Sequence, residues 1–161
     1  MRHVTRLRAR AAARRATTLA AARALHDIRT GRFERTLAGL AAAGAIVTTG
    51  EIYTSHDSAS FGNKMMWLPI AVVPTLLPAG IASVFSRKAA KTVLPLASLL
   101  VILVGLQGTY LHVRGIRRKP GGLRNFRYNV EMGPPAFAPA LASLVGGMGL
   151  LASLLRREGE R

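Results

Sequence analysis

Residues 92–112 read TVLPLASLLVILVGLQGTYLH, a run without Asp, Glu, Lys or Arg. A helix needs about 20 mostly apolar residues to cross the hydrocarbon core of a bilayer. Two further runs, 66–85 and 135–155, also lack all four charged residue types, and a fourth run, 36–54, carries one charge, Glu51. Core helices of soluble proteins rarely stay uncharged over this length. The four runs therefore predict an integral membrane protein of the all-α class.

Short links between these runs predict how the helices lie. Residues 55–65 join the first two runs and residues 86–91 join the second and third. Links of this length place consecutive helices antiparallel and side by side. We therefore expect a four-helix up-down-up-down bundle. Its parts are a basic, helical N-terminal tail at 1–35, the four-span domain at 36–155, a long outer connection at 113–134 and a C-terminus at 156–161.

The charge distribution predicts an orientation in the membrane. The formal net charge is +16, which in a soluble protein suggests nucleic-acid binding. Here 16 of the 23 Lys and Arg residues lie in the tail, the 86–91 link and the C-terminus, all on one side of a four-span protein. Basic residues concentrate on the cytoplasmic side. We therefore expect both termini to be cytoplasmic, and no nucleic-acid partner.

Composition narrows the class of protein further. The chain has no cysteine, which excludes disulfides and cysteine-ligated metal centres. Ala and Arg are used heavily, a bias typical of bacterial chains with high-GC genomes. We therefore expect a multi-pass protein of the bacterial cytoplasmic (inner) membrane, in contact with membrane lipids.

The N-terminal tail has an Ala-rich, Arg-rich sequence in which apolar residues such as Val4, Leu7 and Leu25 recur at helical spacing. This pattern predicts a helix with an apolar face. Two interpretations stay open. The tail is either a solvated segment that fixes orientation by its charge, or a helix on an anionic leaflet, where each basic residue near the surface contributes about 1 kcal/mol.

Small residues and prolines predict local features of the spans. The pairs Gly39/Ala43 and Ala142/Gly146 have the four-residue spacing that lets two membrane helices approach closely. Pro74 and Pro78 each remove a backbone N–H inside the second span. We therefore expect that helix to be kinked or locally widened near its middle.

Polar residues gather where the spans reach their outer ends, and they form the candidate polar or ligand site. Glu51 is the clearest member, because an ionisable residue inside a span is costly and by default suggests a functional site. It either pairs with an arginine of the outer connection or has a ligand or proton role. The members of the candidate site are Glu51, Tyr53, His56, Asp57, Tyr110 and His112.

The two histidines of this site end the first and third spans at similar depth. Facing histidines can bind a b-type haem, and with Glu51 and Asp57 they could form a nitrogen/oxygen metal site. Glu51 and His56 are five residues apart, however, which does not place them on one helix face. A haem also normally has its ligands inside a bundle. No cofactor is therefore predicted, and interfacial hydrogen bonding by His56 and His112 is the competing interpretation.

Tyr53, Trp67 and Tyr110 lie at the same predicted level, the outer interface. Tyrosine and tryptophan are enriched at the headgroup level of membranes. We interpret the three as anchors, with a ring-stacking pocket for a quinone or sugar as the alternative.

The outer connection is unusually basic for that side of the membrane. Phe126, Tyr128 and Val130 alternate with polar residues, which predicts a hairpin or extended segment over the mouth of the bundle. The basic residues could dock lipid phosphates or an acidic partner, or be neutralised internally by Glu51, Asp57 and Glu131. The candidate docking residues are Arg114, Arg117, Arg118, Lys119, Arg124 and Arg127.

Several short motifs resemble those of a known group of proteins. They read EIYTSH at 51–56, SFGNK at 60–64, WLP at 67–69, YLHVRG at 110–115, RYN at 127–129 and GPP at 133–135. Together they resemble a group of small bacterial membrane proteins with four predicted spans, over about residues 32–157. The resemblance implies the four-span fold and assigns no activity or residue role.

Two functions from different classes follow from these features; a third, a small transporter built around the Pro74/Pro78 kink, is disfavoured because no span has a charge near its middle and no internal repeat is visible. The first is a non-catalytic accessory or anchor subunit that docks a partner or lipid through its extracytoplasmic rim, with a membrane complex or an acidic extracytoplasmic protein as the partner. The second is a redox or ligand-binding membrane protein that holds haem, metal or quinone near Glu51, His56 and His112. No nucleophile triad, phosphate-binding loop or zinc-protease motif is present in the sequence, so no enzymatic activity is indicated.

Overall fold

A computed structural model describes residues 2–30, 32–133 and 138–155, without the side chains of residues 2–11, 27, 28 and 138. Within these ranges the chain is helical, with short turns and no strand. This confirms the all-α class. The elements are α1 (Arg2–Thr30), α2 (Phe33–Ser58), η1 (Lys64–Met66), α3 (Trp67–Val72), η2 (Val73–Thr75), α4 (Leu76–Phe85), α5 (Arg87–Lys91), α6 (Val93–Arg117), η3 (Gly122–Asn125), α7 (Phe126–Glu131) and α8 (Ala138–Leu154).

Three helical segments are long and apolar enough to cross a membrane: Phe33–Ser58, Lys64–Phe85 and Val93–Arg117. They cover the first three expected runs except Thr92, and each extends into polar residues at one end or both. The fourth run is represented by α8, an apolar helix of 17 residues, about 26 Å long at 1.5 Å per residue. Pro134 and Pro135, the expected first turn of that helix, lie outside the described residues.

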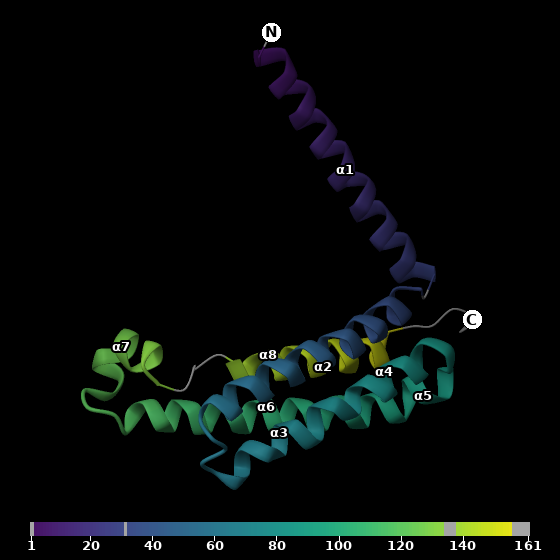
Figure 1. Cartoon of the computed structure of the whole chain (residues 1–161). Helices are drawn as coiled ribbons and strands as arrows, with labels where there is room; N and C mark the ends of the chain where they lie inside the picture. The colour runs from purple at the N-terminus through teal and green to yellow at the C-terminus, as the bar shows by residue number, and fades with distance from the viewer. Residues whose placement is uncertain (1, 31, 134–137, 156–161) are drawn as a thin grey trace.

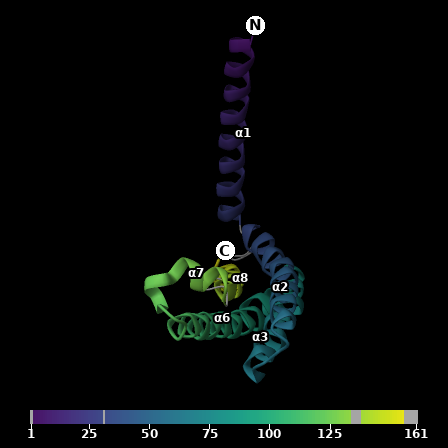
Figure 2. The same cartoon turned by 60° about the vertical axis from the view of Figure 1, so that its left-hand side comes forward.

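Four helical segments lie alongside one another: α2, α3–α4, α6 and α8 (Figure 1). Helix α2 packs on α4 and α8, and α6 packs on α8 and on α3–α4. We call the end where α2 begins, α5 turns and α8 stops the α5 end, and the opposite end the α7 end. Helix α1 contacts α2 and projects away from the α5 end (Figures 1 and 2).

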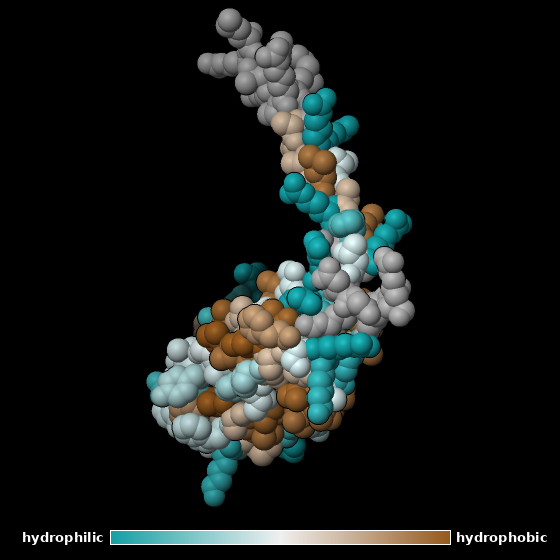
Figure 3. Space-filling model, turned by 90° about the vertical axis from the view of Figure 1, so that its right-hand side faces the viewer, coloured by the Kyte–Doolittle hydropathy of each residue, from teal (hydrophilic) through white to brown (hydrophobic). Residues whose placement is uncertain are grey.

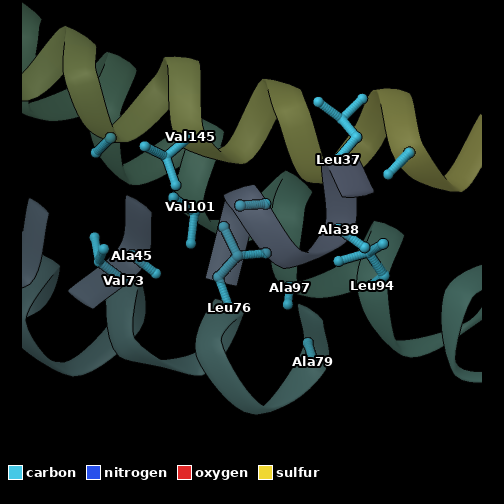
Figure 4. Close-up of a cluster of buried hydrophobic side chains, with 13 residues drawn as sticks. Leu37, Ala38, Ala45, Val73, Leu76, Ala79, Leu94, Ala97, Val101 and Val145 are labelled. Atoms are coloured by element: carbon cyan, nitrogen blue, oxygen red, sulfur yellow. The ribbon is translucent and has the colours of Figure 1, made fainter. Parts of the chain in front are cut away.

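The interior is built largely from small side chains, while many large apolar side chains lie outside. Ala38, Ala41 and Ala45 of α2 are completely buried, among a few larger residues such as Leu76 and Val101 (Figure 4). Brown apolar side chains cover much of the body when it is viewed from the α5 end (Figure 3). Exposed large residues include Leu40, Ile46, Val47, Ile81, Phe85, Leu96, Leu99, Leu100, Leu103, Leu106, Leu144 and Leu151.

This distribution differs from that of a water-soluble domain, which rarely exposes large contiguous apolar areas. Helices in a bilayer gain nothing from hiding leucine, because lipid tails are equally apolar, and they associate through small residues that permit close packing. The small-residue interior and the leucine-rich exterior are therefore compatible with lipid around the three segments of spanning length and α8.

Close packing between α2 and α4 depends on Gly80. A Cβ atom added to Gly80 would lie 2.7 Å from the Ala38 carbonyl oxygen and 2.9 Å from the Ala42 Cβ. The small-residue stretch of the first run thus permits close approach, as predicted, but not through the pair Gly39/Ala43: Ala43 is exposed and Gly39 half-buried, whereas Ala42 is buried. The whole stretch is rich in small residues, so the spacing alone could not show which face packs.

The second predicted contact pair, Ala142/Gly146, is confirmed. Both residues are buried where α8 packs on α6. A Cβ added to Gly146 would lie 2.9 Å from the Ser98 carbonyl oxygen and 3.1 Å from the Ile102 backbone nitrogen, whereas one added to Gly147 would meet no atom within 4 Å. The contact therefore follows one narrow face of α8.

The segment Lys64–Phe85 departs from a regular α-helix at Pro74, as predicted, but not at Pro78, which lies inside α4. Helices α3 and α4 are separated by the 3₁₀ turn Val73–Thr75, which contains Pro74. The helix is tightened at this point, not widened. The Thr75 hydroxyl donates a hydrogen bond to the Val72 carbonyl oxygen at 2.6 Å, which helps to satisfy backbone groups beside the proline.

Helix α1 is a regular helix of 29 residues, but its apolar residues do not gather on one face. The expected apolar face is therefore wrong, because the arginines between the apolar positions occur all around the helix. Leu19 and Leu25 are both exposed, as are Arg14, Arg15 and Arg23.

The outer connection is helical and does not form the expected hairpin or extended segment. Helix α6 continues to Arg117, and η3 and α7 follow. The alternation of Phe126, Tyr128 and Val130 covers only five positions, too few to distinguish a strand from one and a half turns of helix. All three residues lie within α7.

The outer connection is stabilised by hydrogen bonds between its own residues. The Asn129 side chain, 2% exposed, donates through Nδ2 to the carbonyl oxygens of Pro120 at 3.1 Å and Gly122 at 2.8 Å. The Lys119 ammonium donates to the Met132 carbonyl oxygen at 2.8 Å. Gly121 has a φ of 78°, in the left-handed region that favours glycine. The chain therefore turns tightly here and leaves a small folded cap at the α7 end.

Candidate functional site

A cavity of about 700 Å³ opens at the α7 end, between α2, α3, α6 and the beginning of α8. This volume lies within the range of about 300–1,000 Å³ that is typical of small-molecule sites. Its walls are mostly apolar, and most of its polar groups come from the C-terminal parts of α2 and α6, with Asn63 added by the turn before η1. The main apolar lining residues are Met66, Leu68, Pro69, Val104, Leu111 and Leu141.

Three of the six residues of the candidate polar site line this cavity: Glu51, His56 and His112. Glu51 is exposed, and its carboxylate forms no ion pair within the described part of the chain. The expected salt bridge from Glu51 to the outer connection is therefore not formed there. The carboxylate stays available to a ligand at the mouth of the cavity.

The two histidines approach the cavity from opposite helices, His56 from α2 and His112 from α6. Both are half-buried, and they are close enough to interact electrostatically. The Nδ1 atom of His56 is buried, and no hydrogen-bond partner is found for it among the described residues. A ligand in the cavity could satisfy such a ring nitrogen, since buried polar groups normally have a partner.

The other three predicted residues, Tyr53, Asp57 and Tyr110, do not line the cavity. Tyr53 is 46% exposed and Tyr110 is 64% exposed, and Asp57 is exposed too. Trp67, at the beginning of α3, is 52% exposed. The tyrosines and Trp67 thus stand outside the cavity at one end of the molecule, a position that suits anchors at a membrane interface.

Phe61 is the residue of this end that sequence reasoning missed. Its ring stacks on that of Trp67, with centroids 4.3 Å apart and an interplanar angle of 16°, and lies 5.7 Å from the ring of Tyr53. Both Phe61 and Ser60 have left-handed backbone, with φ of 45° and 53°. This conformation is rare for a bulky residue, and the neighbouring Gly62 was the natural place to expect it.

The basic residues of the outer connection divide into two groups. Arg114 and Arg118 line the main cavity. Together with Arg117, they also line a smaller hollow of about 290 Å³. All three side chains are exposed, and no described residue pairs with them. They are the cations that a ligand at the α7 end would meet.

The remaining three candidate docking residues do not reach the cavity. The Lys119 ammonium is engaged by the Met132 carbonyl oxygen, and the Arg127 Nε lies 3.0 Å from the Glu131 carboxylate. Arg124 is exposed on η3. Internal neutralisation therefore occurs at Arg127 and Glu131, while Glu51 does not take part in it.

A metal site at this end is not assembled. Among the described residues, no group of three or more His, Asp or Glu side chains is close enough to hold a metal ion. Asp57 lies outside the cavity that Glu51 and His56 share. The set Glu51, His56 and Asp57 therefore does not fit a nitrogen/oxygen metal centre, and the pair His56 and His112 is what remains for a haem.

A buried carboxylate, also missed from the sequence, lies at the opposite end. Glu34 is 1% exposed, with the Arg35 Nε at 3.7 Å. We expected the first span to begin at Thr36, which left Glu34 in the solvated tail. The spacing from Glu34 to Ala38 and Ala45 places it on the buried face of α2, so helical periodicity could have revealed it.

Lys91 has a structural role at the α5 end that charge counting did not indicate. Its ammonium donates hydrogen bonds to the carbonyl oxygens of Ser153 at 3.0 Å and Leu155 at 2.8 Å. Carbonyl groups in the last turn of a helix lack partners within the helix, and a cation there also complements the helix dipole. Lys91 therefore caps α8 from the α5 turn.

Comparisons of the chain with family models, with curated proteins and with solved structures find no match. The α7 end itself supplies the argument for function. It combines an apolar cavity with a carboxylate from α2 and two guanidinium groups from the end of α6 and the residue after it.

Proposed function

We propose that this chain is a small multi-pass protein of the bacterial inner membrane that acts as a non-catalytic accessory or anchor subunit. Four helices cross the bilayer in an up-down-up-down bundle, with both termini cytoplasmic. The extracytoplasmic rim at the α7 end docks a lipid or the lipid-exposed part of a partner. Membrane lipids surround the bundle, and no nucleic acid takes part.

The membrane part of the proposal is supported by three segments of spanning length and by the leucine-rich exterior. Helix α8 packs on α6 through Gly146 and Gly149 and also contacts α2, so it belongs to the same bundle as the three longer segments. The orientation is supported by the excess of Lys and Arg in the tail, the α5 turn and the C-terminus.

The docking function rests on one observation, the cavity of about 700 Å³ at the α7 end. Its walls are apolar and its rim carries charges that no described residue neutralises. A site for a small polar metabolite would offer more hydrogen-bonding groups and fewer aliphatic ones. An amphiphile, with an apolar part in the cavity and a polar part at the rim, fits both halves of the site.

A cavity-filling variant tests this proposal. Ser55 lines the cavity and is exposed, whereas its neighbour Thr54 is exposed and does not line it. We expect Ser55→Trp to remove the lipids or subunits that co-purify with the full-length protein, and Thr54→Trp to retain them. Equal retention by both variants, measured by native mass spectrometry and subunit analysis, would contradict docking at this rim.

One observation supports a second candidate function, a redox protein that holds a haem b or a quinone. His56 and His112 line the same cavity from two helices, as axial or hydrogen-bonding ligands would. The purified protein would then show a haem absorption band or an extractable quinone that His112→Ala removes. Stoichiometric lipid or subunit without either chromophore would favour the docking function instead.

A further inference from the structure

The rim of the α7-end cavity carries charges of both signs at separate places. The carboxylate of Glu51 comes from α2, and the guanidinium groups come from Arg114 of α6 and from Arg118, the residue that follows α6. All three side chains are exposed and line one cavity, yet none forms an ion pair within the described chain. A ligand that spans the rim therefore meets an anion on one side and two cations on the other.

The apolar part of the cavity can take the upper part of an acyl chain. Its lining along α6 runs from Leu111 back to Val104, about 11 Å at 1.5 Å per residue, and the polar rim with Arg114 and Arg118 lies beyond Leu111. Leu68 and Pro69 of α3 face this stretch, and Leu141 of α8 completes it. The cavity can hold the headgroup and the upper part of a lipid tail, while the rest of the lipid remains in the surrounding bilayer.

No Phe, Tyr or Trp among the described residues lines the cavity, which narrows the class of headgroup. Quaternary ammonium groups are typically bound in aromatic cages. Tyr53, Trp67 and Tyr110 all lie at this end, but none of them lines the cavity, and neither does Phe61. A primary ammonium differs because it has N–H groups that donate charge-assisted hydrogen bonds to a carboxylate such as Glu51.

We propose that the α7-end cavity binds a phospholipid whose headgroup carries a primary ammonium beside its phosphate, as in phosphatidylethanolamine. The Glu51 carboxylate accepts hydrogen bonds from the ammonium, and Arg114 and Arg118 bind the phosphate. An acidic headgroup without the ammonium leaves Glu51 facing a second anion, which is unfavourable. This inference rests on the proposed docking function and specifies the lipid that is docked.

The test uses the full-length protein in detergent with equal amounts of phosphatidylethanolamine, phosphatidylglycerol and phosphatidylcholine of matched acyl chains. Native mass spectrometry measures the first bound lipid. We expect phosphatidylethanolamine to be preferred over the other two by about tenfold, the effect of one charge-assisted hydrogen bond. Ser55→Trp should abolish this preference, because the indole fills the cavity.

Two substitutions separate the roles of the charges. Glu51→Gln should bring phosphatidylethanolamine and phosphatidylcholine to equal occupancy while binding of phospholipid persists, and Asp57→Asn, outside the cavity, should change nothing. Arg118→Gln should weaken binding of all three lipids, with Arg124→Gln as the control. These side chains are exposed, so thermal unfolding should be the same in all four variants.

Each other outcome has a distinct meaning. If phosphatidylglycerol is preferred and Ser55→Trp blocks it, the headgroup assignment is overturned while lipid docking stands. If Ser55→Trp removes a protein subunit and leaves every lipid in place, partner docking stands and the lipid inference falls. If it affects neither, both proposals fail. Competition by water-soluble glycerophosphoethanolamine as strong as that by the lipid would assign the site to a free zwitterion and overturn the lipid assignment.

Discussion

At the scale of single residues, the contact between α6 and α8 depends on glycine, which has no side chain to hold the helices apart. Gly146 lies against the backbone of Ser98 and Ile102, while Gly147, the next residue, meets no neighbour. An added methyl group would therefore clash with α6 at Gly146 and meet no atom at Gly147. The difference in stability between the two alanine variants shows which face of α8 packs on α6.

We expect Gly146→Ala to lower the free energy of unfolding by about 1–3 kcal/mol, because the backbone of α6 must move to make room. Gly147→Ala should be neutral or raise the free energy of unfolding by up to about 1 kcal/mol, since alanine favours helix. Unfolding of the purified variants in detergent measures both. Equal destabilisation by the two substitutions would contradict the packing of α8 described above.

The left-handed backbone at Phe61 gives a second prediction. Phe61→Ala and Phe61→Gly both lose the stacking on Trp67. Left-handed backbone is unfavourable by roughly 1–2 kcal/mol for residues other than glycine. We therefore expect Phe61→Gly to be more stable than Phe61→Ala by about 0.5–1 kcal/mol, after allowance for the greater freedom of glycine in the unfolded chain.

The comparison reverses the usual order of alanine and glycine, so it is a specific test of the turn. Thermal unfolding in one detergent, with Thr54→Ala and Thr54→Gly inside α2 as the matched pair, measures it. In that pair alanine should be the more stable residue, because Thr54 lies within a helix. A more stable alanine at both positions would show that the turn is not left-handed.

At the scale of elements, the α5 turn stabilises α8 at a distance of more than sixty positions along the chain. We expect Lys91→Met to lower the free energy of unfolding by about 1–2 kcal/mol, through loss of two charge-assisted hydrogen bonds. Backbone hydrogen exchange in the last turn of α8 should become faster. Lys88→Met, on the same short helix, removes a charge without a cap, and exchange as fast in that variant would contradict the capping role.

The elements that could be predicted from sequence were those set by long, uniform runs. The apolar runs gave three segments of spanning length, and Pro74 marked the break between α3 and α4, because a missing N–H has a local effect. The packing face of α2 could not be predicted, since Gly39 and Ala43 have the same spacing as the true contact residues Ala38 and Ala42. Which face of α2 is buried depends on where α4 packs, through Gly80.

The candidate site was predictable in part for a similar reason. Ends of antiparallel spans meet, so Glu51, His56 and His112 were expected together, and they line one cavity. The positions of Asp57 and Tyr110 depend on rotation about their helices, which the sequence does not specify. Phe61 lies in a turn whose shape follows from its ring contacts, and no single-residue propensity indicates those contacts.

At the scale of the whole molecule, the chain offers a direct test of orientation because it contains no cysteine. Lys88 lies in α5, on the proposed cytoplasmic side, and Arg124 lies in η3, on the proposed outer side; both are exposed. In intact spheroplasts, a membrane-impermeant maleimide should label Arg124→Cys and not Lys88→Cys. After lysis both should react. Labelling of Lys88→Cys in intact spheroplasts would overturn the proposed topology.

The break at Val73–Thr75 divides the second span into two parts that are held very differently. Helix α4 buries Leu76, Ala79 and Gly80 against its neighbours, whereas α3 contains no fully buried residue. The second segment is therefore packed tightly along α4 and more loosely along α3, which still contacts α2 and α6. Since α3 forms one wall of the α7-end cavity, we expect this wall to move more readily than α4.

This mechanical difference can be measured between paired nitroxide labels. A pair at Ala71 of α3 and Leu106 of α6 should show a broad distribution of distances, and a pair at Ile81 of α4 and Leu96 of α6 a narrow one; all four positions are exposed. A lipid in the cavity should narrow the first distribution and leave the second unchanged. The width of the cavity entrance would then vary with the α3–α6 distance, because few side chains of α3 are buried.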